Sequence, residues 1–110
     1  MVKQGDIIKI NLSPKSGHEQ KGYRPYICLS NKAVNTYSNI GVFAPISNTD
    51  RNYPFYVNIT GNLIQTTGKV LLDQLVAIDY NARDYKYVET IDDVLLESLL
   101  NRARAIFEKG

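Results

Sequence analysis

The chain has 110 residues, of which 44% are hydrophobic and 22% charged, and its net charge at pH 7 is +2. This length predicts one domain over residues 1–110, and the average composition excludes intrinsic disorder. The single cysteine, Cys28, and the single histidine exclude a disulfide framework and a four-ligand zinc site within one chain. We therefore expect a buried thiol at Cys28, and no metal or other cofactor.

We also expect a cytoplasmic protein. No apolar run reaches the roughly 18 residues of a membrane span, and the amino terminus has no apolar segment typical of a signal peptide. The positive charge is concentrated in residues 1–39, which hold six Lys or Arg and two Asp or Glu, against seven and nine in residues 40–110. This asymmetry favours an anionic partner for the first half, although a hydrated lysine-rich surface would give the same pattern.

The first half of the chain predicts three strands, a polar loop and a helical turn. Residues 6–11 are rich in β-branched side chains and bounded by turn formers, which is typical of a strand. Residues 13–23 lack apolar periodicity and predict a surface loop. Further strands are expected over residues 26–30 and 40–46, with a helical turn over residues 31–37 between them.

The second half predicts a polar loop over residues 47–52 and a strand over residues 53–59. Pro54 places that strand at an edge of the sheet or marks its start, because proline cannot donate to a ladder. Residues 70–78 are apolar except for Asp73-Gln74. One long strand there would have to bury or half-bury a carboxylate, which is a local conflict.

The carboxyl end predicts an amphipathic helix. Thr90 and Asp93 have the spacing of a capping box. The apolar residues that follow fall on one helical stripe, which predicts a core-facing surface: Leu95, Leu96, Leu99, Leu100, Ala103, Ile106 and Phe107. Short strands followed by one helix predict a mainly β fold, a small antiparallel barrel or curled sheet with the helix packed against it.

The densest group of polar side chains lies between residues 17 and 25. It combines an imidazole, a carboxylate, an amide and a guanidinium, with glycines on either side. Loops of this kind carry binding and catalytic sites. On composition alone, a hydrated surface loop explains the segment equally well.

The order and spacing of several separate motifs closely resemble those of one family. The motifs are Gly5-Asp6-Ile7, Pro14, Gly17-His18-Glu19-Gln20, Gly22-Tyr23-Arg24-Pro25, Val42-Phe43-Ala44-Pro45-Ile46-Ser47, Tyr53-Pro54-Phe55, Asp73-Gln74 and Ile78-Asp79. They resemble the MazF/PemK family of toxin mRNA interferases, and PemK-like toxins most closely. The resemblance spans nearly the whole chain.

This resemblance implies a small SH3-like barrel of the CcdB/MazF/PemK type with a carboxyl-terminal helix. It implies a homodimer that cleaves single-stranded mRNA at preferred sequences without a metal ion. It also implies a cognate antitoxin whose acidic, disordered carboxyl-terminal segment crosses the RNA site. Such a partner would suit the basic first half of the chain.

Metal-free RNA cleavage uses the 2′-hydroxyl of the substrate as the nucleophile, so the protein must supply a base, an acid and positive charge for the phosphorane oxygens. Arg24 offers a guanidinium fork that matches phosphate oxygens. Ser47 matches the family position whose hydroxyl binds the scissile phosphate, and His18 could stabilise charge or hold a flanking nucleotide. The simpler alternatives are an ion pair of Arg24 with Glu19 or Asp73, a turn role for Ser47, and a solvated His18.

The expected RNA-binding residues come mainly from the two polar loops: Gly17, Glu19, Gln20, Lys21, Tyr23, Asn48, Thr49, Arg51 and Gln74. Tyrosines in polar surroundings, such as Tyr23, Tyr53 and Tyr85, could stack on bases. Tyrosine is also an ordinary half-buried strand residue, so these rings alone do not indicate RNA binding.

Asp73 has two open roles. In one branch of the family an arginine two residues before this aspartate acts as the acid, but here that position is Leu71. The chain therefore resembles more closely the branch in which the arginine of Arg24-Pro25 and the serine or threonine carry the reaction. Asp73 is either a base near the 2′-hydroxyl or a carboxylate that fixes a loop, and we favour the second role because a buried carboxylate needs donors.

Two other classes of protein would use the same barrel. A sister branch of the fold poisons DNA gyrase by protein contact and lacks nuclease chemistry, and a plain RNA-binding barrel would bind without cutting. The loop from Gly17 to Pro25 together with Ser47 favours the nuclease, because a gyrase poison does not need them.

Overall fold

The computed structural model describes residues 1–12 and 22–110. Within these residues the elements are β1 (Asp6–Asn11), β2 (Tyr23–Cys28), α1 (Lys32–Ser38), β3 (Gly41–Ser47), β4 (Tyr56–Asn58), β5 (Lys69–Leu71), the 3-10 turn η2 (Leu72–Gln74), β6 (Val76–Ile78), the 3-10 turn η3 (Tyr80–Ala82), β7 (Tyr85–Thr90) and α2 (Asp93–Ile106). The predicted class, mainly β with a carboxyl-terminal helix, is confirmed.

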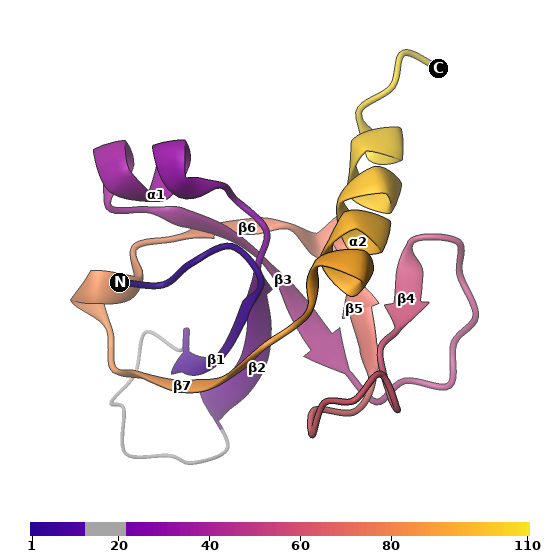
Figure 1. Cartoon of the computed structure of the whole chain (residues 1–110), viewed down its shortest axis with the longest axis horizontal. Coiled ribbons are helices and arrows are strands. Elements are labelled where there is room, and N and C mark those ends of the chain that lie inside the picture. Colours follow the sequence, from indigo (N-terminus) through magenta and orange to yellow (C-terminus); the bar gives the residue numbers. More distant parts are fainter. Residues whose placement is uncertain (13–21) are drawn as a thin grey trace.

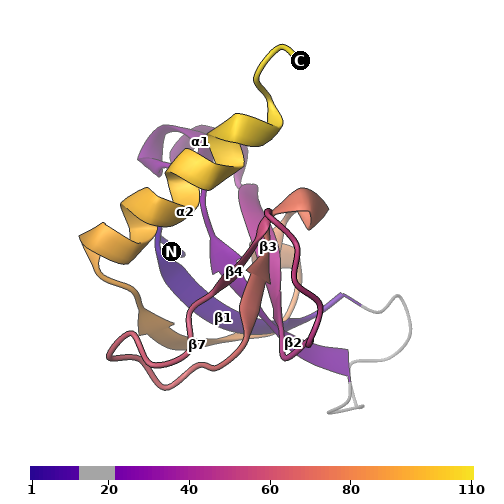
Figure 2. The same ribbon diagram turned by 90° about the vertical axis from the view of Figure 1, so that its right-hand side faces the viewer.

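All the strands belong to one antiparallel sheet with the order β4-β5-β3-β2-β1-β7, and β6 also pairs with β3. The sheet curls strongly, and α2 crosses it (Figures 1 and 2). In the described part of the chain no pairing joins β4 to β7, so the sheet forms an open barrel. Pro54 precedes β4, which is the outermost strand at its end of the sheet, as the proline predicts.

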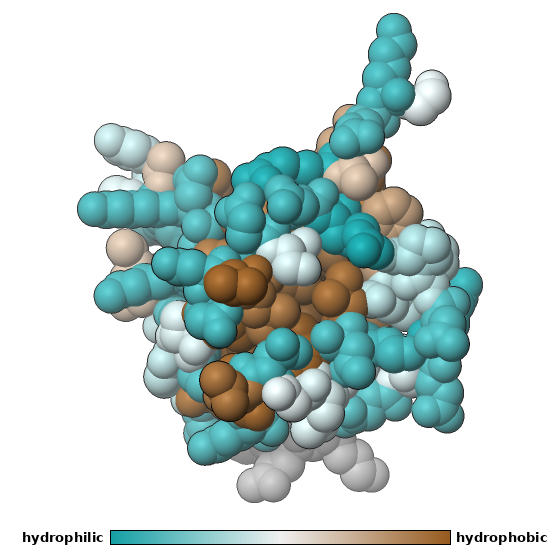
Figure 3. All heavy atoms as spheres, turned by 45° about the vertical axis from the view of Figure 1, so that its right-hand side comes forward, coloured by the Kyte–Doolittle hydropathy of each residue, from teal (hydrophilic) through white to brown (hydrophobic). Residues whose placement is uncertain are grey.

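The sheet buries side chains on both of its faces. Because successive side chains of a strand point to opposite faces, Ile7 joins the core beneath α2, whereas Ile8 and Ile10 join a second core with Phe43 and Tyr80. Leu99 of α2 is fully buried in the first core. Apolar atoms still reach the surface in the centre of one face, within a rim of hydrophilic side chains (Figure 3).

A buried polar network ties α1 to the second core. The Asn31 side chain caps α1 by accepting from the N–H groups of Ala33 and Val34. Asn35 donates to the Val2 carbonyl at 3.0 Å and accepts from the Ser30 hydroxyl at 2.5 Å. The helical turn predicted over residues 31–37 is confirmed.

Cys28 is fully buried beside this network, where Asn35 Nδ2 lies 3.4 Å from its sulfur. The sequence prediction of a buried thiol is therefore confirmed.

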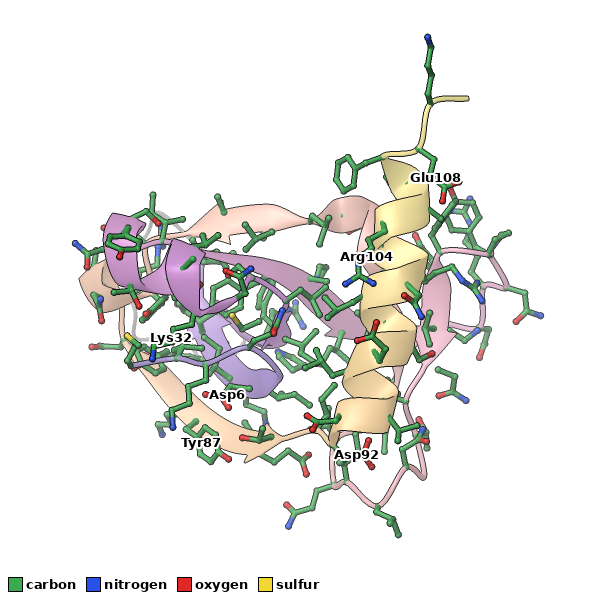
Figure 4. The ribbon with its side chains drawn as sticks, turned by 45° about the horizontal axis from the view of Figure 1, so that its top comes forward. Asp6, Lys32, Tyr87, Asp92, Arg104 and Glu108 are labelled. Atoms are coloured by element: carbon green, nitrogen blue, oxygen red, sulfur yellow. The ribbon has the colours of Figure 1, made fainter. Side chains whose placement is uncertain are left out.

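The predicted capping box of α2 is wrong. The N-cap is Asp92, at the start of α2 (Figure 4). Its carboxylate accepts from the Leu95 N–H at 2.8 Å. Thr90 ends β7 and instead donates to the buried carboxylate of Asp6 at 2.7 Å. Six residues of the predicted apolar stripe pack into the first core, but Phe107 lies beyond the helix and is 73% exposed.

The single long strand predicted over residues 70–78 is also wrong. The chain forms β5, turns through η2 and continues as β6, so Asp73 lies on the turn and is exposed. Because the chain leaves the sheet at this turn, the carboxylate of Asp73 does not have to be buried. Most apolar side chains of this run, including Val70, Leu72 and Ile78, are buried in the chain's own cores.

Two predicted strands differ from expectation by two or more residues at one or both ends, and one strand was missed. β2 begins at Tyr23 and ends at Cys28, whereas we expected residues 26–30. β4 spans only Tyr56–Asn58 of the expected residues 53–59. β7 was not predicted, because its charged residues obscure the apolar alternation.

No helix of residues 1–12 and 22–110 is long and apolar enough to cross a membrane.

Candidate functional site

Arg24 and Ser47 lie at the same end of two paired strands. The antiparallel pairing of β2 with β3 runs from Cys28–Phe43 to Tyr26–Pro45 and stops two residues short of Arg24 and Ser47. Beyond that point β2 and β3 continue as strands but do not pair with each other. The Arg24 side chain is exposed and Ser47 is half-buried, so both can meet a ligand from solvent.

A groove of about 400 Å³ opens at these strand ends. Its wall on β1 and β2 consists of Lys9, Tyr23, Arg24 and Pro25, and the rest is formed by Asn48, Gln65, Thr66, Thr67 and Val88. A second hollow of about 300 Å³ lies alongside and shares Asn48. It is lined by Asn48, Thr49, Asp50, Asn58, Thr60, Gly68 and Lys69. The two hollows therefore meet at the residue that follows Ser47.

Gly68 allows the two strands at this junction to approach closely. A Cβ atom at Gly68 would lie 2.8 Å from the Ser47 carbonyl oxygen, and the backbone φ of +119° is one that other residues rarely adopt. Lys69 pairs with Ser47 in the β3–β5 register. Glycine at position 68 is thus required to bring β5 against the end of β3.

The loop after Ser47 is held through Lys69. The Lys69 ammonium donates to the Arg51 carbonyl at 2.7 Å and to Asn52 Oδ1 at 3.3 Å. One side chain on β5 therefore fixes the path of residues 48–52, which the sequence alone did not indicate.

The other wall of the groove is held by Glu89 on β7. Its carboxylate accepts from the Gln65 N–H at 3.0 Å, from the Thr66 N–H at 2.7 Å and from the Thr66 hydroxyl at 2.5 Å. Burial raises the pKa of the Glu89 carboxyl, but the bonds from Thr66 and Gln65 outweigh it, so the pKa lies below its ordinary value of 4.5. Glu89 is therefore ionised at neutral pH and anchors the loop that carries Gln65, Thr66 and Thr67.

An aromatic cluster lies near the start of β4. The Arg51 guanidinium lies 5.3 Å from the ring centre of Tyr53 and 5.8 Å from that of Tyr56, and the two rings meet edge to face at 5.0 Å. Gln74 Nε2 donates to the Tyr56 hydroxyl at 3.3 Å. Arg51 and Gln74 thus serve this cluster, and neither lines the two hollows.

The structure brings together some of the predicted site residues and separates others. Tyr23, Arg24 and Asn48 line the groove, and Thr49 lines the adjoining hollow. Asp73 is on η2, beyond the opposite end of β5 from Lys69, and no described side chain donates to it. The remaining predicted residues, Gly17, His18, Glu19, Gln20 and Lys21, lie outside the described residues.

Sequence reasoning missed most of the groove's other side chains. Lys9 carries the clearest signal, as the one charged residue within the otherwise apolar run from Ile7 to Ile10. Gln65, Thr66 and Thr67 sit in a polar stretch that reads as an ordinary loop, and only their contact with Glu89 shows their place. In the described residues no three His, Cys, Asp or Glu side chains are grouped so as to hold a metal ion.

The structural class of the protein is an open antiparallel barrel with a carboxyl-terminal helix. A basic groove lies at the ends of β2 and β3. The family described as "PemK-like, MazF-like toxin of type II toxin-antitoxin system" matches residues 3–107. The chain belongs to this family.

Individual proteins resemble the chain in sequence or in fold. The endoribonuclease PemK of Escherichia coli is 33% identical over 108 residues, which cover 96% of this chain and 81% of that protein. The crystal structure of MazF from Deinococcus radiodurans superposes with a TM-score of 0.77 at 25% identity and 94% coverage of both chains. A MazE–MazF structure from the same bacterium gives a TM-score of 0.79 at 19% identity, covering 98% of this chain and 96% of that one, and supports the fold.

The Glu89 anchor predicts an acid-dependent contribution to stability. Because the folded pKa of Glu89 is depressed, its stabilisation is present above the ordinary pKa of 4.5 and is lost as the pH falls through the folded pKa. Replacing Glu89 with glutamine should lower the free energy of unfolding at pH 7 by about 1–3 kcal/mol, the range for hydrogen bonds to charged groups. Urea unfolding of the parent protein and the variant at pH 7 and at about pH 3 measures this loss. The difference in unfolding free energy between the two proteins should be smaller at the lower pH.

Glu97→Gln is the matched control, because among the described residues Glu97 pairs only with Arg104, at 3.3 Å, and both side chains are 61% exposed. Its effect should stay below about 1 kcal/mol. A loss for Glu89→Gln that is the same at both pH values would contradict an ionised anchor.

Proposed function

We propose that this chain is a toxin of a toxin–antitoxin system that cleaves single-stranded mRNA at preferred sequences, acting in the cytoplasm. The observation that carries the proposal is the placement of Arg24 in a groove beside the end of β3, in a chain of the PemK/MazF toxin family. The endoribonuclease PemK of Escherichia coli, at 33% identity, supports the same activity.

In the proposed reaction the 2′-hydroxyl of the nucleotide before the cut attacks the adjacent phosphorus. The bond to the 5′-oxygen breaks, which leaves a 2′,3′-cyclic phosphate upstream and a 5′-hydroxyl downstream. Negative charge accumulates on the non-bridging oxygens during the attack, and the exposed Arg24 fork can bind two of them. The Ser47 hydroxyl at the neighbouring strand end donates to the same phosphate in this proposal.

Proton transfer must come from groups that reach the 2′- and 5′-oxygens. His18 is our candidate, because imidazole titrates near neutrality. Asp73 is less suited to the role, since it lies beyond the far end of β5 from the groove. We therefore keep Asp73 as a structural residue in the proposal.

The basic wall of the groove also suits the second expected partner. Lys9 and Arg24 line it together. An antitoxin segment that is acidic and disordered could occupy the same surface and exclude RNA, with its carboxylates in place of phosphates.

The experiment that tests the function is incubation with a long unstructured RNA, with and without EDTA. Cleavage should persist in the chelator and should leave cyclic or 3′-phosphate ends and 5′-hydroxyl ends. A substrate with 2′-deoxyribose at the mapped cut site should resist, because its nucleophile is missing. Binding without any cleavage would support the plain RNA-binding alternative, and cleavage that requires metal would show a water-based mechanism.

Two substitutions separate the catalytic candidates. Arg24→Ala should reduce the cleavage rate on the order of a hundredfold or more, because it removes charge stabilisation from the transition state. Asp73→Asn should reduce it only modestly, and Arg104→Ala on the exposed face of α2 is the control for loss of an arginine. If a folded Asp73→Asn variant is as inactive as Arg24→Ala, Asp73 is the base.

We also propose that the active species is a two-fold dimer. The apolar residues at positions 70–78 are largely buried in the chain's own cores, so a two-fold interface must use other surfaces. Exposed apolar side chains are available for such an interface, among them Tyr37, Leu63 and Val94. Sedimentation at micromolar concentration should show a dimer, and a monomer that still cuts RNA would refute it.

A further inference from the structure

We propose that Lys9 and Lys86 form a phosphate-binding subsite that carries the RNA away from Arg24 across β1 to β7. This inference rests on the proposed function and adds the direction in which the substrate leaves the cut. It starts from the register of the sheet, in which Lys9 of β1 stands directly opposite Lys86 of β7.

Two lysines at directly opposite positions are unfavourable for the fold. Side chains of such a pair share one face of the sheet with their Cβ atoms about 4.5–5.5 Å apart, and like charges there are destabilising. Both lysines are exposed, and neither forms an ion pair with any described residue. An anion bound between them would offset their repulsion.

The nearby acidic side chains do not neutralise the pair. Glu89, on the same strand as Lys86, is committed to Gln65 and Thr66. Asp84 lies before β7, is exposed, and pairs with neither lysine. The positive charge is therefore available to a ligand.

The pair continues the positive surface of the groove. Lys9 lines the groove with Arg24, and it pairs across β1 and β2 with Pro25, the residue after Arg24. On three adjacent strands Lys9 and Lys86 share one face with Pro25, over two strand spacings, about 10 Å. Arg24, which the register places opposite Ile10 on the other face, reaches the same groove at the strand end. A flexible ammonium suits contacts with successive phosphates, which hold the strand without reading its bases.

The salt dependence of RNA binding tests the subsite. The probe is a single-stranded RNA of about 16 nucleotides with 2′-deoxyribose at the mapped cut site, so that it binds without being cut. For single strands each phosphate contact contributes about 0.7 to the slope of log K against log salt, or about fivefold in affinity at 0.1 M salt. Lys9→Ala/Lys86→Ala should lower the slope by about 1.4 and the affinity about 25-fold. Lys109→Ala, in the exposed tail after α2, should change neither.

Lys86→Glu separates RNA binding from a structural role. It creates an opposite-charge pair with Lys9, so the melting temperature should stay the same or rise, whereas RNA affinity should fall further than with Lys86→Ala. If the double variant keeps the slope of the parent protein, or if Lys86→Glu loses stability and affinity together, the subsite is wrong. If the parent protein cuts the all-ribose RNA, the proposed function stands whether or not the subsite does. If the parent protein neither cuts nor binds RNA, the proposed function and the subsite are both refuted.

Discussion

The pairing of β1 with two neighbours is the constraint on which the rest of the molecule depends. β1 is hydrogen-bonded to β2 on one side and to β7 on the other, and its side chains enter both cores. β2 carries Arg24 to one wall of the groove, and β7 carries Glu89, which anchors the other wall. A shift of one residue in either register would turn Lys9 and its neighbours to the opposite face, so the groove depends on this double pairing.

The sequence could predict the elements whose burial is regular. β1 and β3 and the helix α2 have clear apolar patterns, and their positions agree closely with prediction. The edge strand β7 could not be found, because the charged residues Lys86 and Glu89 interrupt its apolar pattern. Their contacts are with residues far away in the sequence: Glu89 binds Thr66, and Lys86 stands opposite Lys9. The turn at Asp73 was also hidden, since Leu71, Leu72 and Leu75 on either side read as one continuous strand.

The candidate site was predictable only in part. A family resemblance pointed to Arg24, and the structure places it in a groove. The opposite wall comes from residues 65–67, more than 40 positions away, and no local pattern marks such a polar loop as part of a site. It became visible only through Glu89 and through the close approach at Gly68, both of which are long-range contacts.

The two loops that border the groove are held mainly by their backbone. Lys69 binds the carbonyl of Arg51, and Glu89 binds the N–H groups of Gln65 and Thr66. Carbonyl and N–H groups persist when most side chains are exchanged. An outward side chain such as that of Gln65, whose N–H alone is bonded, is thus free to vary during evolution while the loops keep their paths. A lineage of such chains could acquire new base preferences by point mutation without rebuilding its fold.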